Sequence, residues 1–136
     1  IYLDILGFKN ISLLNSDDNK LTDFKCISNT DSILVSCAQN SLYGKEAKDE
    51  DDWETTGRPE IQSFLARMYI NDCKKGIFIT NSYFSDLAIE FVDNFNNKNQ
   101  DVEIKLINGY ELTKSIRNHK YYILKEELLN ETKYNI

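Results

Sequence analysis

The 136-residue sequence has no apolar run near the roughly 18 residues that a membrane-spanning helix needs. Its first residues also lack the charged, then apolar, then small-residue order of a secretory signal. We therefore expect a soluble protein without membrane contact. The expected location is intracellular: the cytoplasm, in association with the nucleoid if the protein binds DNA.

Cysteine is scarce. Cys26, Cys37 and Cys73 are odd in number, lie in apolar surroundings and show no Cys-x-x-Cys spacing. A disulfide framework or a zinc site needs paired cysteines at suitable spacings. The pattern therefore favours buried, reduced thiols.

Basic residues are outnumbered, with 16 Lys and Arg against 22 Asp and Glu and a net charge of −6. This balance counts against a general nucleic-acid binder, because phosphate neutralisation needs clustered Lys and Arg. The acidity is local, however, since residues 45–54 hold a net charge of −4 and the rest of the chain only −2. Residues 39–56 lack hydrophobic periodicity, so we expect an acidic insertion loop whose 45–54 part offers a site to a basic protein partner.

Apolar residues make up 41% of the chain, and eight Tyr and seven Phe are available to fill a core. This is the size and composition of one domain, which we place at residues 1–120, with 121–136 as a C-terminal helix or linker to a further domain. The sequence opens inside an apolar, helix-like run without Met or a capping residue. We therefore expect a fragment of a longer protein.

The first half predicts three consecutive strands. These are Lys9 to Asn15, Thr22 to Ser28 and Ser32 to Ala38. Between the last two, Asn29-Thr30-Asp31 has the length and chemistry of a hairpin loop.

The second half alternates helices and strands. A helix is predicted from near Pro59, the only proline, to near Asn71, and a buried strand over Lys75 to Thr80. Ser85 is a plausible cap for a second helix, followed by a strand at Val102 to Ile107 and a short helix from Gly109. This order predicts an α/β fold with a right-handed parallel crossover.

This layout resembles the restriction-endonuclease-like fold, and three blocks are similar to the Mrr-type restriction endonuclease domain of the PD-(D/E)xK nuclease superfamily. The blocks are Gly57-Arg58-Pro59-Glu60-Ile61-Gln62-Ser63-Phe64, the run Lys75 to Ser85, and Ile107-Asn108-Gly109-Tyr110-Glu111-Leu112. With Leu6-Gly7-Phe8, which resembles the end of that family's first helix, the resemblance covers residues 2 to about 116. It implies a three-layer α/β core with a central mixed sheet of about five strands flanked by helices.

The family's active-site pattern is an Asp on the second strand and, fifteen residues later, a Lys on the third strand. A Gln or Glu stands two positions before that Lys. Here Asp23 falls at the Asp position, Ser36 at the Gln or Glu position, and Ala38 at the Lys position. The resemblance implies Mg²⁺ held by Asp23 and by the backbone carbonyl of Cys37. It also implies metal-dependent hydrolysis of double-stranded DNA by a restriction or defence protein.

Ala38 cannot act as acid, base or charge stabiliser, and loss of such a group typically costs on the order of 10² to 10⁴ in rate. We therefore expect little or no cleavage, and weakened or lost metal binding. Ser36 is either a weak ligand or a small polar strand residue. Glu60 either supplies a substitute carboxylate to the site or interacts favourably with the dipole of the helix in whose first turn it lies.

Two explanations for Ala38 stay open. One is an engineered Lys-to-Ala change that abolishes cleavage by the nuclease. The other is natural divergence to a pseudo-nuclease that binds DNA or a protein partner, which the further departures at Ser36, Gln39 and Asn40 favour. The candidate phosphate contacts, each also explained as part of a solvated face, are Lys74, Lys75, Lys114, Arg117 and Lys120. The sequence predicts neither the DNA sequence recognised nor the oligomeric state.

Overall fold

The computed structural model describes residues 8–17, 21–39 and 55–118. Its main sheet has five strands in the order β1-β2-β3-β5-β7, and a separate two-stranded sheet is formed by β4 and β6. The elements are β1 (Lys9–Asp17), β2 (Leu21–Ser28), β3 (Asp31–Ala38), β4 (Thr55–Thr56), α2 (Arg58–Ile70), β5 (Lys75–Thr80), β6 (Tyr83–Phe84), α3 (Asp86–Lys98) and β7 (Glu103–Ile107).

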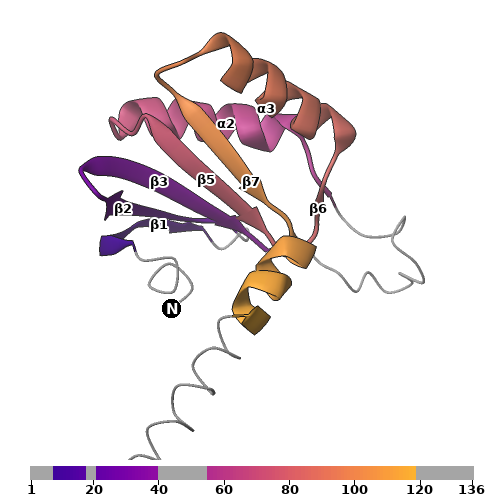
Figure 1. The fold of residues 1–136 in the computed structure, drawn as a ribbon, viewed down its shortest axis with the longest axis horizontal. Helices are drawn as coiled ribbons and strands as arrows, with labels where there is room; N and C mark the ends of the chain where they lie inside the picture. Colours follow the sequence, from indigo (N-terminus) through magenta and orange to yellow (C-terminus); the bar gives the residue numbers. More distant parts are fainter. Residues whose placement is uncertain (1–7, 18–20, 40–54, 119–136) are drawn as a thin grey trace, which may run out of the picture.

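The main sheet is mixed. β1, β2 and β3 form an antiparallel meander, whereas β5 and β7 continue the sheet parallel to β3. The parallel connections run through α2 and α3, which lie together on one face of the sheet (Figure 1). The predicted α/β class and the order of the five main-sheet strands with α2 and α3 are therefore confirmed.

Local capping explains where the two long helices begin. In α2, the carboxylate of Glu60 accepts a hydrogen bond from the Gly57 N–H at 3.1 Å. The hydroxyl of Ser85 accepts from the Ala88 N–H at 3.2 Å and so caps α3. Such side chains satisfy N–H groups that have no partner within the helix, which fixes the first turn.

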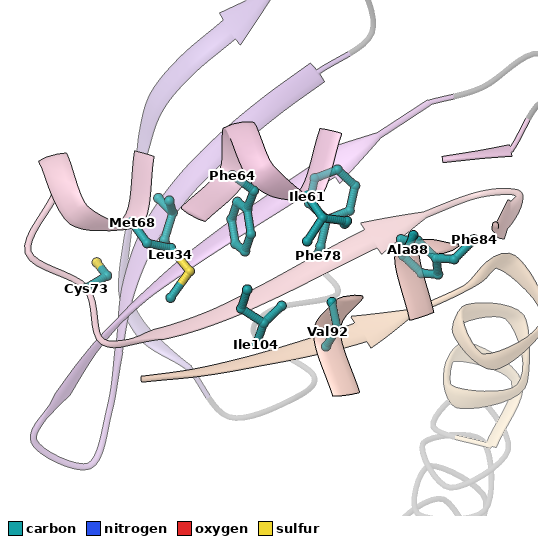
Figure 2. Close-up of a cluster of buried hydrophobic side chains, with 10 residues drawn as sticks. All are labelled: Leu34, Ile61, Phe64, Met68, Cys73, Phe78, Phe84, Ala88, Val92 and Ile104. Carbon is teal, nitrogen blue, oxygen red and sulfur yellow. The ribbon is translucent and has the colours of Figure 1, made fainter. Parts of the chain in front are cut away.

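Side chains alternate between the two faces of the sheet, and each face has its own apolar cluster. The larger cluster lies between the sheet and the two helices (Figure 2) and contains Leu34, Ile61, Phe64, Met68, Cys73, Phe78, Phe84, Ala88, Val92 and Ile104. The cluster on the other face contains Cys26, Ile33, Val35, Ile77, Ile79 and Ile107, with Leu112 packed against it. β3 and β5 are thus buried on both sides.

Gly76 sets how closely α2 approaches the sheet. A Cβ atom at this position would lie 2.5 Å from the Met68 sulfur and 2.7 Å from a Phe64 ring carbon. Both distances are far below van der Waals contact, so only glycine allows this packing. The close approach carries the middle of α2 directly over the face of β3 and β5.

The pair β4 and β6 was not predicted. Each strand has two residues, too few to show an alternating pattern, and Thr56 belongs to the segment expected to be a loop. The helix that follows β7 covers 109–118, longer than the short helix expected. The expectations for the N-terminal run, the acidic segment 45–54 and the C-terminal 121–136 lie outside the described residues. In the ranges that are described, no helix is long and apolar enough to cross a membrane.

Candidate functional site

The β2–β3 hairpin brings together residues predicted to form the site. Asp23 lies directly opposite Ser36, and Leu21 lies opposite Ala38. Ser36 and Ala38 are two residues apart on one strand, so their side chains share the face of the sheet that α2 covers. Asp23 and Ser36 are both buried.

The residue that contacts both Asp23 and Ser36 is Arg67, which was not predicted from the sequence. Its Nε donates to one carboxylate oxygen of Asp23 at 2.7 Å, and its Nη2 lies 3.4 Å from the other. Nη2 also donates to the Ser36 hydroxyl at 3.2 Å. One guanidinium therefore faces both carboxylate oxygens and the neighbouring hydroxyl.

Arg67 is itself held by the helix that carries it. Its Nη1 donates to the Ser63 hydroxyl, one turn earlier, at 2.8 Å. The guanidinium carbon lies 5.7 Å from the centroid of the Phe64 ring, within range of a cation–π contact. These contacts fix the orientation of the planar group before it meets Asp23.

Burial gives this ion pair its importance. The Asp23 side chain is only 3% exposed and that of Arg67 20% exposed. A charged carboxylate in such a place is costly without a partner, because it has lost its water shell. Arg67 supplies that partner, and its planar guanidinium matches the geometry of a carboxylate.

Ala38, where the resemblance implies a lysine, contributes a methyl group. Ala38 lies beside Thr80 in the β3–β5 register and packs against the larger apolar cluster. The Thr80 hydroxyl is buried and accepts hydrogen bonds from the Thr56 hydroxyl and the Ser82 N–H, both at 3.2 Å. Hydroxyl and methyl groups therefore occupy the carboxyl ends of β3 and β5 on this face.

Cys37 points to the opposite face and packs against the second apolar cluster. Its backbone belongs to a strand paired on both sides, with Thr22 and with Ile79. Burial, and then the negative charge of Asp23, raise the pKa of the Cys37 thiol to about 11. Of the three free cysteines, Cys26 and Cys73 are buried, as predicted, whereas Cys37 is partly exposed.

These residues do not fit a divalent metal ion in the arrangement observed. Mg²⁺ requires oxygen ligands at about 2.0–2.1 Å in near-octahedral geometry. Asp23 is the single carboxylate of the set, and a cationic side chain already contacts both of its oxygens. Among the residues that the structure describes, no group of three or more His, Cys, Asp or Glu side chains is placed to hold a metal.

Glu60 does not contact this cluster in the structure. Its side chain is exposed and accepts the Gly57 N–H at the start of α2. Seven residues separate it from Arg67, which is about 10 Å along a helix axis. The capping arrangement corresponds to the helix-dipole interpretation of Glu60.

The five candidate phosphate contacts are divided between the two ends of the sheet. Lys74 and Lys75 lie at the amino end of β5, where Lys75 pairs with Asp31 at 2.8 Å. Lys114 and Arg117 are exposed on the 109–118 helix, which follows β7. Because β7 runs parallel to β3, this helix starts at the carboxyl end of both strands (Figure 1). Lys120 lies outside the described residues.

A weak signal for Arg67 was present in the sequence. It stands between Phe64 and Met68, on the border of the apolar face of α2, where a charged side chain is partly covered. Asp23 likewise stands in a strand with apolar neighbours and needs a cation when buried. What the sequence could not supply is that these residues, 44 positions apart, meet.

A comparison with protein families supports the resemblance drawn from the sequence. The model Mrr_cat, described as a restriction endonuclease, matches residues 6–116. No curated protein matches the chain. The matched range contains all the described strands and long helices, together with Asp23, Ser36, Ala38 and Arg67. The chain therefore belongs to the Mrr-type restriction endonuclease family.

Proposed function

We propose that this domain is a non-cleaving member of the Mrr-type family, from a restriction or defence protein, that keeps the nuclease fold in order to bind double-stranded DNA. The observation that carries the proposal is the contact of Arg67 with Asp23 and Ser36, beside a methyl group at position 38. Hydrolysis in the family depends on a metal and on a lysine. Neither role has a fitting group in this arrangement.

The replacements support natural divergence over a single engineered change. The short side chain of Ser36 leaves room for the guanidinium and accepts a hydrogen bond from it. An isolated Lys-to-Ala change at position 38 would account for neither Ser36 nor Arg67. Asp23, Ser36 and Arg67 together form a consistent polar cluster, and the Ala38 methyl group packs against the apolar core beside it.

DNA binding is supported by where the exposed cations lie. Lys114 and Arg117 are exposed, on the helix that begins at the carboxyl end of the sheet near Ala38. The acidic segment 45–54 accounts for most of the negative net charge, so the rest of the chain carries only −2. We propose contacts from Lys114 and Arg117 to DNA phosphates, and an intracellular location where DNA is accessible.

Cleavage is tested with supercoiled plasmid in the presence of Mg²⁺ or Mn²⁺, comparing the wild-type domain with D23N. Because position 38 lacks a lysine and Asp23 is paired with Arg67, both proteins should leave the plasmid intact. Cleavage by the wild-type domain that disappears in D23N would contradict the proposal.

Binding is tested by mobility shift of duplex DNA at 50 and 200 mM salt. We expect K114A/R117A to weaken binding, whereas K74A/K75A, which removes the same charge at the other end of the sheet, should not. Binding should also weaken steeply with salt, because phosphate contacts release counterions. If no complex forms at the lower salt, the DNA role is wrong, and a basic protein partner for residues 45–54 becomes the function to test.

A further inference from the structure

We infer that Arg67 is a built-in cation that takes the place of the family's metal ion, so that the Asp23 site stays closed to divalent cations while Arg67 is present. The inference rests on the proposed loss of cleavage and adds a cause within this chain's own residues. It concerns the contents of the site, which can be measured without any nuclease assay.

The geometry leaves no free carboxylate oxygen for a metal. Nε and Nη2 of Arg67 face the two oxygens of Asp23 at 2.7 and 3.4 Å. A metal bound to either oxygen would share the space now taken by the guanidinium. Two positive groups at that separation repel each other strongly in a buried site, where screening by water is weak.

Displacing Arg67 is also unfavourable for the helix. The guanidinium would give up its hydrogen bonds to Ser63 and Ser36 and its contact with the Phe64 ring. Its side chain is only 20% exposed, so water cannot replace all of these partners without movement of α2. Gly76 holds α2 close to the sheet, which opposes that movement.

The residues at positions 36 and 38 also suit an arginine in place of a metal ion. A Glu at 36 would need the space beside Asp23 that Arg67 now occupies. A Lys at 38 would bring a second cation to the same face, two residues or about 6.6 Å along the strand from Ser36. The small residues Ser36 and Ala38 are therefore those that a guanidinium at this place requires.

The test measures melting temperature with EDTA, with 10 mM Mg²⁺ and with 10 mM Mn²⁺, for four proteins: wild type, S36E, S36E/R67A and S36E/K75A. The first substitution returns a second carboxylate, and R67A removes the built-in cation and makes room for it. K75A is the matched control, because it removes a cation from an exposed ion pair of nearly equal length. Circular dichroism establishes that each variant is folded.

We expect the melting temperature of the wild type, S36E and S36E/K75A to be unaffected by metal. In S36E/R67A, Mn²⁺ should raise the melting temperature by about 5 °C, because a ligand that binds only the folded state stabilises it. Adding D23N to S36E/R67A should abolish the rise. A Mn²⁺-dependent rise in the wild type, an equal rise in S36E with Arg67 in place, or no rise in folded S36E/R67A would each overturn the inference. A wild type that binds metal but does not cleave DNA would leave the proposed function standing.

Discussion

Two ion pairs at opposite ends of β3 have nearly the same length and very different surroundings. Arg67 and Asp23 approach to 2.7 Å with side chains 20% and 3% exposed, whereas Lys75 and Asp31 approach to 2.8 Å with side chains 50% and 48% exposed. Distance alone would rank them as equals. Burial and additional hydrogen bonds separate them.

The difference concerns what happens when one partner is lost. An exposed pair exchanges its partner for water, and such pairs contribute about 0–1 kcal/mol. A buried pair adds little compared with an apolar contact of the same shape, yet removal of one partner leaves a charge without solvent, which costs about 3–5 kcal/mol. Single substitutions in the buried Asp23–Arg67 pair should therefore destabilise the protein strongly, whereas those in the exposed Asp31–Lys75 pair should have little effect.

The largest effect is expected for D23N, which keeps the size of the side chain and removes its charge. The Arg67 guanidinium, only 20% exposed, would remain beside a neutral amide, so the free energy of unfolding should fall by about 3 kcal/mol or more. D31N is the matched change at the exposed end and should cost less than about 1 kcal/mol. Urea unfolding of both variants makes the comparison, and equal losses would contradict it.

G76A should have the next largest effect, because its Cβ would enter the space of Met68 and Phe64. Overpacking of this kind costs about 1–3 kcal/mol. The resulting shift of α2 should also loosen the Arg67 contact, so G76A and D23N should be less than additive in urea unfolding. Strict additivity would mean that the packing of α2 does not position Arg67.

R67K is expected to cost about 1–2 kcal/mol, because it keeps the charge but not the planar fork that reaches both Asp23 oxygens and Ser36. The reciprocal change at the exposed pair, K75R, should leave the stability unchanged, because solvent surrounds this pair. Thermal and urea unfolding of the two variants test this. An R67K protein as stable as the wild type would show that any cation suffices at this place.

The smallest effect is expected at alkaline pH. The raised pKa of Cys37, about 11, lies above the ordinary thiol value near 9, so the neutral thiol favours folding below pH 9. That contribution is lost as the pH rises from about 9 through 11, because the folded state then binds a proton that the unfolded state releases.

Stability should therefore fall more steeply over this range in the wild type than in C37A, as measured by urea unfolding at several pH values. The pKa of Lys75 is also raised, by its hydrogen bond and charge interaction with Asp31, but at an exposed site where solvent weakens the effect. K75A should accordingly change the alkaline profile less than C37A. A larger change in K75A than in C37A would mean that Lys75, and not Cys37, controls the loss of stability at alkaline pH.

Much of the fold was predictable because local sequence patterns determine its elements. Three such patterns depend on neighbouring residues: the nearly continuous apolar run Lys75–Thr80, the cap at Ser85 and the proline near the start of α2. β4 and β6 lacked such a pattern, since two residues cannot display a period.

The site was only partly predictable. The register that places Asp23 opposite Ser36 follows from a hairpin with a short turn. The partner of that pair comes from the third turn of a helix, and its identity depends on how closely α2 packs against Gly76. No local pattern contains that information, because it arises from tertiary packing.

The account is tested most directly by two double-mutant cycles in urea unfolding: D23N with R67Q, and D31N with K75Q. We predict a coupling energy between Asp23 and Arg67 of about 2 kcal/mol or more, because either single change leaves the other partner buried and unpaired while the double change leaves two neutral groups. The Asp31–Lys75 coupling should be markedly smaller, because water replaces the lost partner at this exposed pair. Equal, small coupling energies in the two cycles would contradict the claim that Arg67 is the permanent counter-ion of Asp23.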